Sequence, residues 1–289
     1  HEMGESSIWV KIGAVDRRIL YWILFIMLGI PFLMPLGLPI SMSETTMSLY
    51  NYVETLDNND IAVIGIQAGV SAWPEVLPGL VATTKHLVMR NVKIVFWGFF
   101  TDVDMTMNAI KSRVPQLKWA DESAGPGDYI YGEDWVYVGL LTGGEAAVAQ
   151  LADDLHSIIK ADKFGTPASR IPLLQQVYTA ADFALVITSD TGDYGDYYVR
   201  QWNVRYGTKV AEVGIAMNYS TFIPYYQAGL AIGALKGVRG GAEYERLINS
   251  LGEGTQRMDA LNISHLLTIF AVFMANLSYV MTRGKGGVK

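Results

Sequence analysis

The chain has 289 residues, of which 51% are hydrophobic and 17% are charged. Soluble domains carry about a quarter charged residues on average, so this composition favours a membrane protein. The net charge of −6 argues against a nucleic-acid partner, because such binding rests on neutralising phosphates with Lys and Arg. The chain has no cysteine, which excludes disulfides, thiolate metal sites and a cysteine nucleophile.

Residues 1–18 precede the first long apolar run. Ile8, Trp9, Ile12 and Val15 have rough helical spacing, which predicts an amphipathic segment on the cytoplasmic leaflet, with a frayed tail as the alternative. Residues 19–40 then form 22 residues without a charge. A helix of that length reaches about 33 Å, enough for a hydrocarbon core of about 30 Å.

The first run, residues 19–40, is therefore predicted to be a transmembrane helix. Its prolines, Pro31, Pro35 and Pro39, are expected to kink the helix or to end it near Leu36. A buried core helix, which rarely runs so long without a charge, and a cleaved signal peptide are the alternatives. The run is longer than the apolar part of such a peptide and lacks the small-residue cleavage pattern, so we favour an uncleaved anchor.

Residues 41–259 alternate short apolar stretches with amphipathic ones, and their net charge is −9. Apolar runs predict strands at residues 61–66, 93–99, 135–140, 183–188 and 210–216. Helices are expected at residues 74–90, 102–113, 145–159, 197–206, 222–235 and 242–251. This alternation predicts a mostly parallel five-stranded sheet with helices on both faces, Rossmann-like or flavodoxin-like. Two connections, 116–134 and 160–182, are long, which is typical of functional loops.

Ligands of open α/β sheets bind at the carboxyl ends of the strands, so the residues after each strand are the candidate sites. The third strand is followed by Thr142, Gly143, Gly144 and Glu145. Glycines at a helix start can cradle an anion with backbone N–H groups, although the full GxGxxG pattern is absent. The alternative is a tight turn capped by Thr142.

The fourth strand is followed by Asp190, Asp193 and Asp196. Carboxylates are the ligands that Ca²⁺ and Mg²⁺ prefer, so this loop is a candidate metal site, and no other cofactor is predicted. Two alternatives are a solvated loop in which Asp193 and Asp196 cap the next helix, and a catalytic role for the carboxylates.

The first strand is followed by Ser71, in a stretch similar to a nucleophile elbow but without its closing glycine. A serine hydrolase also needs a histidine, and His86 and His156 both fall inside predicted helices. A Ser-His pair is therefore not favoured, and Ser71 is kept as a candidate ligand-binding residue.

Residues 260–281 form the second uncharged run, interrupted by Asn262, His265 and Asn276, and are predicted to be a second transmembrane helix. A basic tail, residues 282–289, follows it. Lys and Arg flank the outer sides of both runs, whereas residues 41–60 contain none. The positive-inside rule then places both termini in the cytoplasm and the central domain outside the cell membrane.

Clear anchors and the lack of a catalytic constellation favour a non-catalytic, membrane-anchored module. We expect it to contact the lipid bilayer and to assemble with itself, as a homo-oligomer, or as an accessory or scaffold subunit of a larger membrane complex. The alternative is an extracytoplasmic receptor or sensor for a small molecule or a cation, which would bind at the third-strand turn or at the aspartate loop. A hydrolase-type α/β enzyme that uses Asp190, Asp193 or Glu145 is a third hypothesis.

Overall fold

The computed structural model describes residues 15–283. Its internal contacts divide the chain into two units. The helical unit comprises the residues up to Pro39 and those from Thr255 onward, and the α/β unit comprises residues 40–254. The amphipathic segment predicted within residues 1–18 and the basic tail predicted at 282–289 lie almost entirely outside the described residues.

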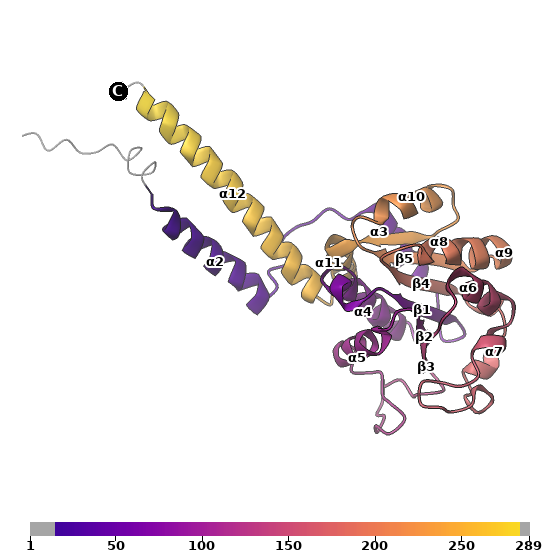
Figure 1. Cartoon of the computed structure of the whole chain (residues 1–289). Coiled ribbons are helices and arrows are strands. Elements are labelled where there is room, and N and C mark those ends of the chain that lie inside the picture. Colours follow the sequence, from indigo (N-terminus) through magenta and orange to yellow (C-terminus); the bar gives the residue numbers. More distant parts are fainter. Residues whose placement is uncertain (1–14, 284–289) are drawn as a thin grey trace, which may run out of the picture. The chain divides into compact units, whose positions relative to one another are not determined.

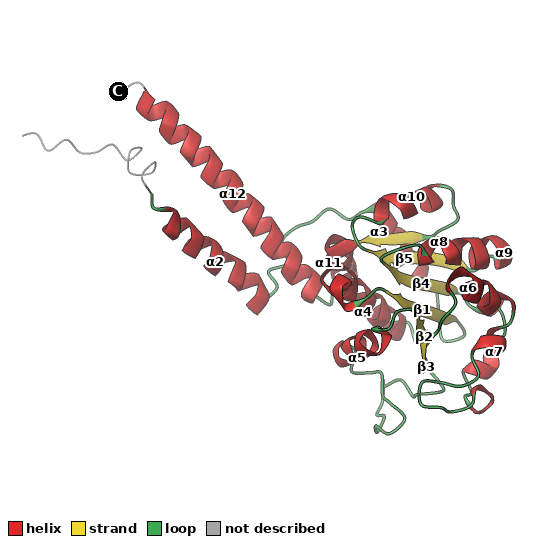
Figure 2. Cartoon of the chain, viewed as in Figure 1, coloured by secondary structure: helices red, strands yellow, loops and turns green. Residues whose placement is uncertain are grey.

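The α/β unit is built on one parallel sheet of six strands in the order β3-β2-β1-β4-β5-β6. This is the doubly wound order of Rossmann folds, so the Rossmann-like prediction is confirmed and the flavodoxin-like alternative is not. Figure 2 shows the strands in yellow between the helices. The strands are β1 (Ile61–Gln67), β2 (Lys93–Gly98), β3 (Trp135–Leu140), β4 (Leu185–Asp190), β5 (Lys209–Gly214) and β6 (Gly233–Lys236).

The prediction of five strands is wrong because β6 was assigned to a helix over residues 222–235. The observed helix in this region ends at Gln227. Gly229 then adopts a positive φ of 75°, which allows the chain to turn into the sheet. A Cβ on Gly233 would lie 2.6 Å from the carbonyl oxygen of Thr45, so close approach requires glycine there. A four-residue strand that starts with Gly-Ala has too little β propensity to be recognised.

Helices cover both faces of the sheet, as Figure 1 shows. Each face has its own apolar core, and the strands are buried on both sides, which is why they read as continuous apolar runs. The first face carries α3 (Glu44–Val53), α4 (Trp73–Met89), α5 (Val103–Arg113) and α11 (Gly237–Leu247). The second carries α6 (Gly144–Asp153), α7 (Leu155–Ile158), α8 (Tyr194–Tyr198), α9 (Val204–Tyr206) and α10 (Tyr219–Gln227).

Three further predicted helices differ from the structure, and the one expected at residues 242–251 lies earlier, at Gly237–Leu247. The helix expected at residues 145–159 breaks at Asp154, whose side chain accepts the Ser157 N–H at 3.2 Å and starts α7. The helix expected at residues 197–206 begins earlier, with α8, and continues through a π-helical turn, Val199–Asn203, into α9. Helix α3 was not predicted.

The helical unit contains α2 (Arg17–Leu33) and α12 (Glu253–Arg283). Among residues 15–283, only α12, over Glu253–Thr282, is long and apolar enough to cross a membrane. Helix α2 has 17 residues, which gives about 25 Å at 1.5 Å per residue, short of a hydrocarbon core of about 30 Å. The prediction of two spanning helices is therefore supported for one of them.

Helix α2 is shorter than the predicted helix over residues 19–40 because it ends before Pro35. Met34 precedes that proline and is extended, with φ −152° and ψ 121°, as the proline ring requires of the residue before it. Residues 34–40 then continue without helical structure. Their backbone N–H groups need other acceptors, which matters most in an apolar environment.

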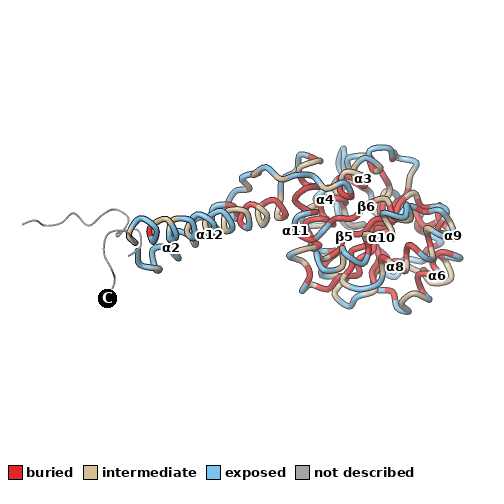
Figure 3. Tube along the Cα trace, turned by 90° about the horizontal axis from the view of Figure 1, so that it is seen from above, coloured by how far each residue is buried: buried red, intermediate tan, exposed pale blue. Residues whose placement is uncertain are grey.

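Asp259 near the start of α12 supplies one such acceptor. Its side chain is 1% exposed and accepts the N–H groups of Leu36, Gly37 and Leu38 at 2.8, 2.9 and 2.9 Å. By contrast, most large apolar side chains of both helices are exposed, including Phe25 at 72% and Leu266 at 64%. Figure 3 colours much of the trace of both helices as exposed. Exposed apolar side chains with satisfied polar backbone groups are what a lipid environment favours.

Candidate functional site

The turn between β3 and α6 holds the first predicted ligand site. Gly143 has a φ of 120° and Gly144 a φ of 55°, so both glycines are required by the backbone. The turn at the helix start is present, but no side chain caps the helix, and Thr142 therefore does not have the capping role expected of it. The glycines serve the turn geometry whether or not a ligand binds.

Glu145 in the first turn of α6 is already engaged. Its two carboxylate oxygens accept Nε and Nη2 of Arg200 at 2.9 and 3.0 Å, and Oε1 also accepts from Gln201 at 3.0 Å. The hydrogen bond from Arg200 is the main cause of a lowered pKa for Glu145. Because this acid and this base neutralise each other, the turn offers an incoming anion no free charge.

Asp190 at the end of β4 points into the protein rather than toward solvent. It is fully buried, and its oxygens accept the N–H groups of Gly192 and Gly195 at 2.7 and 2.8 Å. Burial raises its pKa to about 6. The carboxylate that holds the following turn is thus Asp190, whereas Asp193, at the N-cap of α8, makes no side-chain cap bond.

The three aspartates do not converge on one point. Asp196 faces Arg200 at 3.9 Å, while Asp190 is occupied by its own loop. Within residues 15–283, no group of three or more His, Cys, Asp or Glu side chains is arranged to hold a metal ion. A metal site at Asp190, Asp193 and Asp196 stays a prediction that this arrangement does not support.

Ser71 lies exposed in a short 3₁₀ turn after β1, and it is not among the hydrogen-bond partners found for His86 and His156. His86 is buried between two partners, with Nδ1 2.8 Å from the Tyr244 hydroxyl and Nε2 2.7 Å from a Glu54 oxygen. His156 contacts the Val177 carbonyl at 3.0 Å. Neither imidazole is available to activate a serine.

A cavity of about 510 Å³ lies beside β3, the strand at one edge of the sheet. We call it the β3-edge cavity. Its volume is typical of small-molecule sites, which span about 300–1,000 Å³. Its lining comes from α5, β3 and both long connections, and consists of Asp104, Asn108, Trp119, Ala120, Asp121, Tyr137, Lys163 and Phe164.

Asp104 is the polar centre of the β3-edge cavity. It accepts hydrogen bonds from the Tyr137 hydroxyl and from Lys163 Nζ, each at 2.5 Å. Partial burial raises the pKa of Asp104, but these two hydrogen bonds outweigh it and hold the pKa below its ordinary value. Burial, together with the bond to Asp104, raises the pKa of Tyr137, which therefore stays a hydrogen-bond donor.

Aromatic rings form the walls of the β3-edge cavity. Trp119 packs on Trp135 of β3 with centroids 4.8 Å apart and meets Phe164 edge-on at 5.4 Å. The two long connections are thus joined through their aromatic side chains. Phe164 stays 61% exposed, an unusual state for such a large apolar ring.

Sequence reasoning missed all the residues of this cavity, although it singled out both connections by their length. The residue types gave no motif, because one lysine, two aspartates and three aromatic residues are scattered over some 60 positions. What unites them is the parallel pairing of β2 with β3, which brings α5 and both connections to the same sheet edge.

The chain was compared with protein-family models, with curated proteins and with solved structures, and none of the three comparisons finds a match.

Proposed function

We propose that this chain is a membrane-anchored binding module whose α/β unit takes up a small organic molecule in the β3-edge cavity. The observation that carries the proposal is the cavity itself, with three aromatic side chains and an Asp–Lys pair around one space of about 510 Å³. Mostly apolar walls with a few placed polar groups are the usual make-up of such sites.

The lining favours a ligand with a flat apolar ring and a neutral or positive polar group. Trp119 and Phe164 offer ring surface, which stacks on other rings and attracts cations. Two carboxylates, Asp104 and Asp121, face one ammonium, that of Lys163, so the lining carries a net negative charge. An anionic ligand would be repelled by this charge and by the −9 of residues 41–259.

Three indole probes that differ in charge test this chemistry: tryptamine, indole and indole-3-acetate. Calorimetry on the detergent-solubilised chain should give saturable binding in the order tryptamine, indole, indole-3-acetate. Asp104→Asn should weaken tryptamine binding about tenfold, since a hydrogen bond to a charged group contributes about 1.5–3 kcal/mol.

Asp153→Asn is the matched control. Asp153, like Asp104, accepts from one basic side chain and one tyrosine, here Arg205 and Tyr206, but it lies outside the cavity lining. It should bind tryptamine like the unaltered chain. Equal weakening by both variants, or no saturable binding of any probe, would contradict the proposal.

The anchoring part of the proposal rests on α12. Its exposed apolar side chains include Ile269, Phe270 and Phe273, each at least 60% exposed. We propose that α12 and the first apolar run, residues 19–40, both cross the cell membrane, so that both termini are cytoplasmic and the α/β unit lies outside. Support comes from the basic flanks and from residues 41–60, which contain no Lys or Arg.

Assembly through the membrane helices is a second candidate function, favoured by the same exposed side chains. A helix face that lipid covers in one copy can be covered by a second copy or by another subunit instead. Native mass spectrometry of the detergent-solubilised chain should then show a dimer or a larger particle. A monomer at all concentrations, purified without companions, would count against assembly.

A further inference from the structure

A groove runs along the opposite edge of the sheet, beside β6 and between α3 and α10. Its volume is about 720 Å³, again in the range of small-molecule sites. We call it the β6-edge groove. It is lined by Glu44, Thr45, Ser48, Tyr219, Ile223, Tyr226, Gln227, Gly229, Ala231 and Ile232.

The chemistry of this lining differs from that of the β3-edge cavity. Most of its side chains carry a hydroxyl, an amide or a carboxylate, and hydroxyls and amides can both donate and accept hydrogen bonds. No Lys or Arg is among the lining residues, whereas Glu44 contributes a carboxylate, so the lining itself does not favour an anionic ligand. The nearby Lys236 lies over the Tyr219 ring, 5.2 Å from its centroid.

Two long hydrogen bonds now bridge the groove. Thr45 Oγ1 lies 3.3 Å from the Tyr219 hydroxyl, and the Tyr226 hydroxyl donates to Glu44 Oε1 at 3.1 Å. Hydrogen bonds between oxygens are usually about 2.7–2.8 Å, so a ligand with hydroxyl groups can replace both bridges with shorter bonds. The Gln227 side chain is exposed, and no partner for its amide is found among residues 15–283.

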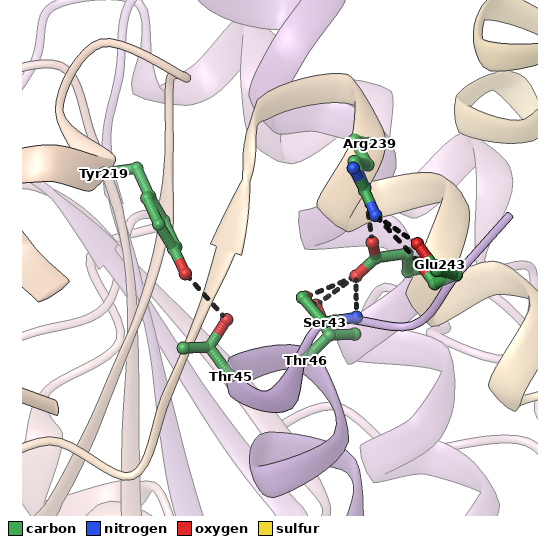
Figure 4. Close-up of polar contacts among 7 residues, drawn as sticks. Ser43, Thr45, Thr46, Tyr219, Arg239 and Glu243 are labelled. Atoms are coloured by element: carbon green, nitrogen blue, oxygen red, sulfur yellow. Dashed lines mark hydrogen bonds and ion pairs between the residues drawn. The ribbon is translucent and has the colours of Figure 1, made fainter. Parts of the chain in front are cut away.

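The α3 wall of the groove is held in place from behind. Figure 4 shows the buried carboxylate of Glu243 on α11 facing the start of α3. It accepts the Ser43 N–H at 3.1 Å, the Ser43 hydroxyl at 2.5 Å and the Thr46 hydroxyl at 2.8 Å. Arg239 donates to Glu243 at 2.7 Å and to the Ser41 carbonyl at 3.0 Å.

These contacts matter for the groove because they fix the turn that supplies its polar groups. Glu44 and Thr45 stand between the two residues that Glu243 holds, so the first turn of α3 is set before any ligand arrives. Fixed polar groups lose less entropy on binding than mobile ones, which favours affinity.

We propose that the β6-edge groove binds a neutral, polyhydroxylated ligand, namely a saccharide. Its ring hydroxyls would bond with Glu44, Thr45 and Gln227, and its apolar C–H face would pack on Tyr219 and Tyr226, whose rings are apolar with a polar tip. The same chemistry is offered by a free saccharide and by the head group of a glycolipid. This site is independent of the β3-edge cavity and of the ligand proposed there.

The test uses the full chain in a detergent whose head group is not a sugar. Glucose, galactose, mannose and maltose are each titrated, and binding is followed by saturation-transfer NMR on the sugar protons. In a second arm, the chain is placed in lipid nanodiscs with and without a galactosyl diacylglycerol. Saturable binding of a free sugar identifies a soluble saccharide, and binding seen only in the second arm identifies a glycolipid.

Glu44→Gln and Gln227→Ala should each weaken the binding about tenfold, while Tyr178→Phe, a change at an exposed tyrosine outside the groove, should not. Circular dichroism checks that α3 is intact in each variant. Failure of all probes in both arms overturns the proposal, and so does equal affinity in the groove variants and the control.

Discussion

Buried carboxyl groups with raised pKa values are expected to make the stability of this protein depend on pH, and Glu212 of β5 is the clearest case. Its side chain is 2% exposed, and no hydrogen bond to its carboxyl group is found among residues 15–283. Burial first, and then the charges of Asp190 and Asp196, raise its pKa well above the ordinary value of 4.5. Glu212 is therefore protonated over a pH range in which the same residue is ionised in the unfolded chain.

The sign of the effect follows from that difference. A folded-state pKa above the unfolded value contributes stability that is fully present below pH 4.5 and is lost as the pH rises toward the folded-state pKa. Asp190 acts in the same direction between its ordinary value of 3.8 and about 6.

We predict that Glu212→Gln stabilises the fold at neutral and alkaline pH. Glutamine has the shape of the protonated acid and cannot ionise. The free energy of unfolding of the variant should therefore not fall with rising pH through this group, as it does in the unaltered chain. Each pKa unit corresponds to about 1.36 kcal/mol, so the gain at pH 8 should be on the order of 1 kcal/mol or more. Urea unfolding at pH 5 and pH 8 measures it. Glu133→Gln, at an exposed site, is the control, and an identical pH slope in both variants would refute the prediction.

Glu243 allows a second prediction at this scale. Its side chain is 1% exposed, and its carboxylate accepts hydrogen bonds from Ser43, Thr46 and Arg239. Glu243→Ala leaves these donors without their acceptor, and breaking a buried charged network costs about 3–5 kcal/mol. Chemical denaturation should show that loss. A loss below about 1 kcal/mol would mean that water replaces the carboxylate and that the α3 wall is not held by it.

At the scale of elements, the turn from β3 into α6 contains two consecutive glycines, Gly143 and Gly144. They differ in how much space a side chain would have at each position. A Cβ on Gly143 would lie 2.9 Å from the Ala147 Cβ at a φ of 120°, whereas a Cβ on Gly144 would meet nothing within 4 Å. We predict that Gly143→Ala costs about 3 kcal/mol and Gly144→Ala about 1 kcal/mol. Thermal unfolding of the two variants checks the order, and a reversed order would show that the turn has another conformation.

The elements also show what the sequence can and cannot predict. The central strands were recognisable because burial on both faces makes them unbroken apolar runs. By contrast, β6 and α3 depend on each other, since the Thr45 backbone can approach β6 closely only because residue 233 is a glycine. Elements that form through tertiary contact carry little local signal, and the same is true of the β3-edge cavity, whose residues meet only after β2 pairs with β3.

For the whole molecule, the proposed membrane anchoring makes a prediction about the number of crossings. Helix α2 has 17 residues, so the helix alone is too short to cross a hydrocarbon core of about 30 Å. We predict that it crosses with the help of residues 34–40, because the apolar run continues to residue 40 and Asp259 satisfies the N–H groups of Leu36 to Leu38.

The absence of native cysteine makes this prediction easy to test. Single cysteines at Ser7, Asn58 and Gly287 are exposed to a membrane-impermeant maleimide in intact cells. Only Asn58→Cys should react if both helices cross and the termini are cytoplasmic. Reaction of Ser7→Cys together with Asn58→Cys would show that α2 does not cross. Reaction of Ser7→Cys and Gly287→Cys, without Asn58→Cys, would reverse the orientation.

The two buried carboxylates that hold the N-terminal part of the chain have a consequence for how the protein is made. Glu243 lies 200 residues after Ser43, and Asp259 lies 223 residues after Leu36. At about 5–20 residues per second, a ribosome needs on the order of 10–40 s to reach them. During that time, the first apolar helix and the start of α3 are already outside the ribosome without their acceptors. These contacts can therefore form only after residues 243 and 259 have been synthesised, which makes them late steps in the folding of the described chain.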